Sequence, residues 1–158
     1  MSGNVYDSLH VLENVIFLKK SPLFSSMKTG DLRAVAEIAE EMTFSGGDEI
    51  VRENDVGDSM YIIKEGSVAI SKEAGDRRLE LARLKKGDCF GDMAIFDAEV
   101  RSASVIARDT CTLLRIDSDA LKDVLIDYPS IAIELLKIFV KRLRAANETI
   151  QGLSASGG

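Results

Sequence analysis

Hydrophobic residues near the start of the chain follow the spacing of helices. An amphipathic helix is predicted over residues 5–18 from apolar residues that recur every three or four positions: Val5, Leu9, Leu12 and Ile16. Thr29 is a candidate N-cap for a second helix over 30–40, because its hydroxyl can accept a hydrogen bond from a free N–H of the first turn. The chain therefore opens with a helical lead-in, predicted over residues 5–40.

From residue 42 the spacing changes to that of short strands. Turn signals such as Ser45-Gly46-Gly47-Asp48 and Lys86-Gly87-Asp88 separate most of the apolar runs. The predicted strands cover these ranges: 42–44, 49–52, 60–64, 67–71, 79–84, 103–107 and 111–116. Many short strands at this spacing indicate a β sandwich or barrel.

Helical spacing returns after residue 117. Asp117 or Ser118 can cap a helix over 119–127, which Pro129 ends. A last helix is predicted from about residue 130 to 151. Apolar residues at helical spacing lie on one side of it: Ile131, Leu135, Ile138 and Leu143.

The chain of 158 residues has the length of one domain, and no internal repeat interrupts it. A single domain over 1–158 is predicted, in which the lead-in is followed by a β-roll over 41–117, C-terminal helices over 118–151 and a flexible tail over 152–158.

Composition and charge argue against several classes of protein function. No apolar run approaches the roughly 18 residues of a membrane span, and the first residues do not form a signal peptide, so a cytoplasmic location is expected. The net charge is −6, and residues 31–60 hold nine acids against two bases, which argues against direct binding of nucleic acid. The single histidine, His10, and two separated cysteines, Cys89 and Cys111, do not form a typical metal or nucleophile site. An enzyme or a metal cofactor is therefore not expected.

One segment, residues 90–104, does not follow the pattern of short apolar strands separated by turns. Gly91 begins a predicted helical turn that ends near Phe96, and the exposed N–H groups of such a turn attract phosphate. Arg101 stands at the start of the next apolar strand, where its guanidinium can form a bidentate pair with phosphate oxygens. The combination predicts an anion site.

The whole segment resembles the phosphate-binding cassette of the cyclic nucleotide-binding domain family, which includes bacterial catabolite activators and the regulatory subunits of cAMP-dependent kinase. The matching positions are Phe90, Gly91, Met93, Ala94, Arg101 and Ser102. Further upstream the match continues at Gly57, Asp58, Tyr61, Ile63, Gly66 and Val68. The resemblance covers roughly residues 15–150 and implies a mainly β fold, an eight-stranded jelly roll with flanking helices.

The resemblance also implies roles for individual residues. The cyclic phosphate would pair with Arg101, with help from Ser102 and from the backbone N–H groups of Met93 and Ala94. The ribose 2′-hydroxyl would bond to Asp92. The Arg-Ser-Ala triplet at 101–103 is similar to that of the bacterial activators.

Three positions depart from the family pattern, and one of them is Val100, which stands where Pro is common. Asp92 stands where Glu is usual, and its reach is shorter by about 1.5 Å, so the ribose contact is expected to be lost, bridged by water or restored by a small shift of the segment. Asn147 falls where the activators offer hydroxyl groups to the adenine, and its amide can bond to a base edge. In this family a Thr directly after the cassette arginine often accompanies a preference for cGMP. This chain has Ser102 at that position, which shares only the hydroxyl group of Thr, so cAMP is favoured over cGMP.

The predicted function is a cyclic nucleotide-binding regulatory module, in which the ligand at residues 90–102 repositions the C-terminal helices. The alternative is a degenerate member of the family that lacks nucleotide affinity and serves as an interaction or dimerisation module. The apolar side of the last helix could form a homodimer, as in the activators, or pack on its own barrel. The chain is either a stand-alone sensor or a regulatory domain of a longer protein with an effector domain.

Overall fold

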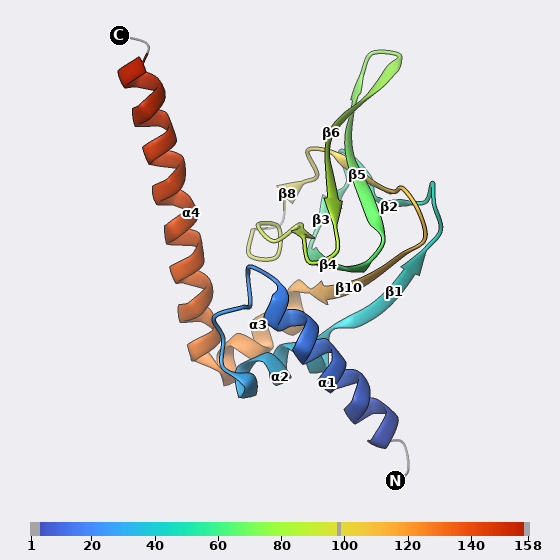
Figure 1. Cartoon of the computed structure of the whole chain (residues 1–158), viewed down its shortest axis with the longest axis vertical. Helices are drawn as coiled ribbons and strands as arrows, with labels where there is room; N and C mark the ends of the chain where they lie inside the picture. Colours follow the sequence, from blue (N-terminus) through green and yellow to red (C-terminus); the bar gives the residue numbers. More distant parts are fainter. Residues whose placement is uncertain (1–3, 98, 157–158) are drawn as a thin grey trace.

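The computed structural model describes residues 4–97 and 99–156, and it contains a β-roll with helices before and after it in the chain. Two helices precede the strands, α1 (Asn4–Lys20) and α2 (Thr29–Ile38). Two follow them, α3 (Ser118–Asp127) and α4 (Pro129–Ser156). Of these, α1, α2 and α3 lie together on one side of the roll (Figure 1). The order of helices, strands and helices predicted from the sequence is confirmed.

The described residues form two four-stranded sheets and one short pair, all antiparallel. In spatial order the first sheet contains β1 (Glu40–Phe44), β10 (Cys111–Asp117), β4 (Ser59–Glu65) and β7 (Cys89–Phe90). The second contains β2 (Glu49–Val51), β9 (Ser104–Ala107), β5 (Ser67–Ala74) and β6 (Arg77–Lys85). A separate pair is formed by β3 (Val56–Gly57) and β8 (Glu99–Val100). The two larger sheets supply the eight strands of the expected jelly roll. The sequence did not predict β3, β7 and β8, because two residues are too few to show a period.

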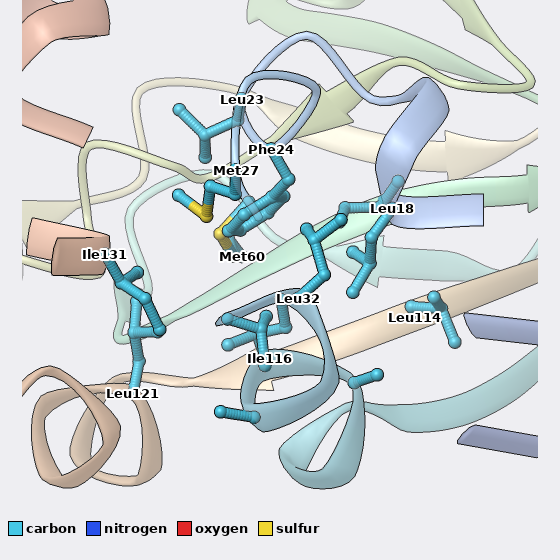
Figure 2. Close-up of a cluster of buried hydrophobic side chains, with 14 of the residues drawn as sticks. Leu18, Leu23, Phe24, Met27, Leu32, Met60, Leu114, Ile116, Leu121 and Ile131 are labelled. Carbon is cyan, nitrogen blue, oxygen red and sulfur yellow. The ribbon is translucent and has the colours of Figure 1, made fainter. Parts of the chain in front are cut away.

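The first sheet is covered on both faces, which explains why nearly all of β4 is buried. Because side chains alternate along a strand, Met60 and Ile62 face the helices while Tyr61 and Ile63 face the second sheet. Figure 2 shows Met60 beside side chains of the helical lead-in. This cluster joins side chains from both ends of the chain: Leu18, Leu23, Phe24, Met27, Leu32, Leu114, Ile116, Leu121 and Ile131.

The prediction of a first helix is confirmed, but the face inferred to be apolar is not the one that packs. Leu9, Leu12 and Ile16 are each more than half exposed, whereas Val15 and Leu18 are buried. The side chain of Val5 lies outside the described part of the chain. The helix has apolar residues on two adjacent faces, so only docking against the sheet could select between them.

The two predicted caps have different outcomes. Of the two candidates for the cap of α3, Asp117 and Ser118, Asp117 is the N-cap, and its carboxylate accepts a hydrogen bond of 3.2 Å from the N–H of Ala120. Thr29 is not an N-cap. It is the first residue of α2, and Lys28 occupies the cap position without a side-chain hydrogen bond.

The last helix is longer than predicted. α4 continues to Ser156, so residues 152–156 are helical where the sequence predicted a flexible tail. Gly152 lowers helix propensity by only about 1 kcal/mol, and a single glycine does not end a long helix. Residues 157–158 lie outside the described part. No helix in that part is long and apolar enough to span a membrane.

Candidate functional site

A pocket of about 300 Å³ lies between β8 and the turn that follows β7, residues 91–97, here termed the cassette turn. Every binding residue predicted from the sequence lines it except Asn147: Phe90, Gly91, Asp92, Met93, Ala94, Arg101 and Ser102. The rest of the wall was not predicted: Val51, Asp97, Val100, Ala103 and Val105. The aliphatic residues among them fit the alternating pattern of ordinary strands, so nothing in the sequence marks them as part of a binding site.

Gly91 shapes the entry to the cassette turn. Its φ is +78°, a conformation that other residues rarely adopt. A Cβ at this position would lie 2.7 Å from Nη1 of Arg101, so the absence of a side chain also makes room for the guanidinium. The N–H groups of Phe96 and Asp97 donate to the carbonyl of Met93, at 3.3 and 3.2 Å. These bonds close the single turn that the sequence predicted.

The cassette turn is fixed to the core on one side only. Ile95 is buried among the helices, and its carbonyl accepts a hydrogen bond of 2.7 Å from the Ser118 hydroxyl at the start of α3. Met93 lies on the exposed side. Within the described chain, no hydrogen bond engages the N–H groups of Met93 and Ala94. These two donors are therefore available to a ligand in the pocket.

Arg101 is held in place by its backbone and by one end of its side chain. Its N–H donates to the carbonyl of Asp55 at 2.7 Å, and its own carbonyl accepts from the N–H of Asn54 at 2.8 Å. The guanidinium crosses Gly57, where any Cβ would collide with it. Nη2 donates to the carbonyl of Ser59 at 2.7 Å. The guanidinium is thus oriented before any ligand arrives.

The remaining donors of Arg101 give the site its chemistry. Its Nε is buried and has no hydrogen-bond partner among the described residues, and no carboxylate in that part forms an ion pair with its guanidinium. A buried donor without a partner costs about 1–3 kcal/mol, and more when the group is charged. An anion that accepts from this guanidinium and from the free amides of the cassette turn would remove that cost.

Asp92 connects the cassette turn to α4. Its carboxylate is paired with the guanidinium of Arg142, and its side chain is only 16% exposed. The hydrogen bond with Asp92 raises the pKa of Arg142 above the ordinary value of an arginine. The Arg142 guanidinium also lies 5.6 Å from the centre of the Phe139 ring. Phe139 in turn meets Phe96 of the cassette turn edge to face, with 5.8 Å between the ring centres. One charged and one aromatic contact therefore join the turn to the same helix.

Comparison with known proteins identifies the family to which this fold belongs. The family model of the cyclic nucleotide-binding domain matches residues 41–128, more than half of the chain. The chain belongs to this family. The match contains the cassette turn, Arg101 and both large sheets, so the resemblance read from the sequence is confirmed.

Relatives of this cyclic nucleotide-binding domain include regulators of two kinds. The CRP-like cAMP-activated global transcriptional regulator of Mycobacterium tuberculosis is 29% identical over 137 residues, covering 86% of this chain and 61% of the regulator. The N-terminal domain of a transcriptional regulator from Streptomyces coelicolor superposes with a TM-score of 0.80 at 28% identity, covering 85% of this chain and 94% of that one. The regulatory domain of Toxoplasma gondii PKA, crystallised with cAMP, has a TM-score of 0.71 at 27% identity, covering 85% and 51%.

The two cysteines of the domain are the first residues of β7 and β10, and they show no reactive features. Burial raises the pKa of the Cys89 thiol to about 11, and the nearby Asp92 carboxylate adds to this shift. Cys111 is buried and donates to the carbonyl of Ser67 at 3.0 Å. Both thiols therefore stay protonated near neutral pH. No group of three metal-binding side chains occurs in the described part of the chain.

Asn147 lies apart from the other predicted residues of the domain. It is exposed on α4, beyond Arg142, and it is not part of the pocket wall. Conversely, Gly57 and Ser59 hold Arg101 in position. From the sequence, Gly57 was identified only as part of a family motif, and Ser59 was not identified. Their contribution comes through backbone atoms and through the absence of a side chain, which sequence patterns describe poorly.

Proposed function

We propose that this domain is a sensor that binds a cyclic nucleotide, with cAMP favoured over cGMP, and transmits binding to α4. The buried Nε of Arg101, which has no partner in the described chain, carries the proposal. Arg101 lines a pocket whose wall also includes Met93 and Ala94, whose backbone N–H groups have no hydrogen-bond partner in the described chain. The preference for cAMP is supported by the mycobacterial relative, which is cAMP-activated, and by the Toxoplasma neighbour, which holds cAMP.

In this proposal the phosphate occupies the space beside Arg101 and Ser102, where it accepts from the guanidinium and from the free amides of Met93 and Ala94. The ribose 2′-hydroxyl donates to the Asp92 carboxylate. The reduced reach of Asp relative to Glu limits the strength of this bond. The contact predicted between Asn147 and the base stays a prediction, because this residue lies outside the pocket wall.

The signal would pass through the two contacts between the cassette turn and α4. A ribose that bonds to Asp92 competes with Arg142 for the same carboxylate. A shift of the turn would also move Phe96 against Phe139. Binding would therefore change the relative free energies of two placements of α4 on the domain, and so shift the population from one placement to the other.

The proposal includes a homodimer formed through α4, because this helix has more apolar surface than its own domain covers. Ile131 and Leu135 are buried against the domain. Leu136 and Leu143 on another side of the helix are each 62% exposed. No direct contact of this domain with nucleic acid is proposed, in keeping with its net charge of −6.

Isothermal titration of nucleotide-free protein tests the proposal. Wild-type protein is expected to bind cAMP at micromolar concentration or tighter, and cGMP more weakly. Arg101→Gln is expected to weaken binding at least a hundredfold, because it removes the charge and the buried donor. Arg108→Gln, the same change at an exposed arginine, should leave affinity within twofold.

Two outcomes would contradict the proposal in different ways. Affinity of Arg101→Gln within twofold of wild type would show that the phosphate binds elsewhere. Absence of binding to either nucleotide up to millimolar concentration would instead support the alternative, a family member without nucleotide affinity that acts as an interaction module.

A further inference from the structure

The outer strand of the second sheet, β6, has a free edge. It is the last strand in the order of that sheet, and in the described sheet it pairs only with β5, from Arg77 to Lys85. Within the described chain, no backbone hydrogen bond joins residues 77–84 to any element other than β5. An edge strand presents a row of unused N–H and C=O groups, which is a template for pairing with another strand.

The side chains of β6 are also open to solvent. Every one is exposed except that of Leu84, which is half-buried and packs against the core between the two sheets. Leu79 and Leu81 are 55% and 53% exposed. Figure 1 shows the hairpin of β5 and β6 extending beyond the other strands of the roll. A partner can therefore reach this edge without displacing any described part of the domain.

β6 is basic although the chain as a whole is acidic. Residues 77–86 contain five basic side chains and one acidic side chain, a local charge of +4 in a chain whose net charge is −6. Arg83 is paired with the one acid, Glu80, at 2.7 Å. The other cations of the segment form no ion pair within the described residues: Arg77, Arg78, Lys85 and Lys86. These charges are free to attract an anionic partner.

The charge of the edge restricts which strand can pair with it. Pairing of β6 with β6 of a second copy would place two basic edges side by side, and like charges on neighbouring strands are destabilising. A strand with acidic side chains would instead meet Arg77 and Arg78 with opposite charge. The edge therefore disfavours self-association and favours an acidic partner.

Nucleic acid is a less suitable anion for this hairpin. A two-stranded β-ribbon reads duplex DNA by entering the major groove with both strands. Here the end of β5 and the turn that follows it hold Glu73 and Asp76, which would meet the phosphates with like charge. Only the outer edge of the hairpin is basic, and a strand edge matches an extended peptide better than a groove.

We propose that β6 is a docking strand for an acidic, extended segment of a partner protein, which adds a fifth strand to the second sheet. Main-chain hydrogen bonds to the free edge supply affinity, and side chains supply selectivity. The cations of β6 select acidic side chains, and Leu79 and Leu81 select apolar ones beside them. The inference goes beyond the proposed function and requires no nucleotide, because Arg77 and Arg78 lie outside the ligand pocket.

Fluorescence anisotropy with labelled peptides tests the docking on the full chain. An octapeptide of alternating glutamate and valine is expected to bind with micromolar affinity, and added salt should weaken binding because exposed charges are screened. The same peptide with lysine in place of glutamate should not bind. The acidic peptide with every backbone amide N-methylated keeps its charge but has no N–H donors, so it should bind at least tenfold more weakly. Equal binding of the N-methylated peptide, or no binding of the acidic peptide up to millimolar concentration, would overturn the inference.

Charge reversal at the edge tests the location of the docking site. The double variant Arg77→Glu and Arg78→Glu is expected to bind the acidic peptide at least tenfold more weakly and to gain affinity for the lysine peptide. The matched control, Lys122→Glu and Lys141→Glu on α3 and α4, changes the net charge equally and should leave peptide binding within twofold. All four residues are exposed, so both proteins should remain folded. Equal losses in the two double variants would reduce the effect to net charge and overturn the assignment to β6.

Further measurements separate this inference from the proposed function and from other occupants of the edge. The Arg77→Glu and Arg78→Glu variant should bind cAMP within twofold of wild type, so failure of peptide binding and failure of nucleotide binding are distinguishable. Labelled duplex DNA should bind the wild-type protein more weakly than the acidic peptide does. Tighter binding of DNA that this variant abolishes would assign the edge to nucleic acid and overturn the inference. A fall in molecular mass by light scattering in the same variant would assign the edge to a second copy and would also overturn it.

Discussion

The guanidinium of Arg142, on α4, is paired with the carboxylate of Asp92, in the cassette turn. These residues are 50 positions apart in the chain. The acid expected to receive the ribose hydroxyl is therefore already held by the helix that is expected to report binding. Arg142 is 44% exposed and Asp92 16%, so the pair is partly screened by water.

Arg142→Met is predicted to strengthen cAMP binding two- to fivefold. The ribose would no longer compete for Asp92, and a partly exposed ion pair contributes about 0.2–1 kcal/mol. Isothermal titration measures the change. Lys141→Met removes the same charge from the neighbouring position and should have no effect. A 2′-deoxy analogue of cAMP should bind both variants as it binds wild type, because it makes no demand on Asp92. Weaker cAMP binding by Arg142→Met would show that the pair supports the site instead of competing with the ligand.

Gly57→Ala is predicted to lower cAMP affinity at least tenfold. The added Cβ would overlap the side chain of Arg101, so the guanidinium must move from its position beside Ser59. Gly30→Ala is the matched control, because no atom lies within 4 Å of its Cβ position on α2. This control should retain affinity and gain about 0.5–1 kcal/mol of stability. Equal affinity in the two variants would show that the position of Arg101 does not matter for binding.

Neighbouring residues of the cassette turn should differ sharply in their effect on stability. Ile95 is 1% exposed within the core, so Ile95→Ala is predicted to cost about 2–5 kcal/mol. Met93 is 69% exposed, so Met93→Ala should stay within about 0.5 kcal/mol. Urea unfolding measures both values. Similar costs for the two variants would indicate that the turn is not fixed to the core through Ile95.

A buried lysine joins α1 to the first sheet through ion pairs, so the docking of α1 is predicted to depend on pH. Nζ of Lys64 lies 2.8 Å from the Glu13 carboxylate on α1 and 3.1 Å from that of Glu41 on β1. The hydrogen bond from Lys64 lowers the pKa of Glu13 from its ordinary 4.5. Burial opposes the charge of Lys64, but the bonds to both carboxylates outweigh it and raise the pKa of Lys64 above its ordinary 10.5.

When folding lowers the pKa of a carboxyl group, the ionised group stabilises the folded state at pH values above its pKa in the unfolded chain. This stabilisation is lost as the pH falls through its pKa in the folded protein. A raised lysine pKa adds stability that is present below its unfolded value and lost as pH rises through the folded one. Lys64→Met is therefore predicted to cost about 1 kcal/mol near neutral pH, and less below the ordinary pKa of Glu13. Urea unfolding between pH 3 and 7 measures the difference, with Lys72→Met as the exposed control. A cost that does not change with pH would exclude the ion pairs as its cause.

The candidate site was largely readable from the sequence because its chemistry is local. Gly91, Asp92 and the residues after them follow one another along the chain, and Arg101 stands a short distance further on. Residues 91–94 stay close in space in any fold, whereas Arg101 is brought back to them by the pairing of β8 with β3. The wall contributed by Val51 and the support from Ser59 come from distant strands, so they could be identified only after folding.

Residue spacing and turn chemistry were sufficient to predict a sandwich or barrel of short strands with flanking helices, and to limit the cap of α3 to Asp117 or Ser118, because these features depend on neighbours in the chain. Tertiary packing decided which face of α1 is buried, since both faces of that helix carry apolar residues. It also decided that Arg142 meets Asp92, and that Leu143 is left exposed on a helix whose other side is covered. Contacts between residues far apart in the chain depend on how the helices dock on the sheet, and no local pattern encodes that geometry.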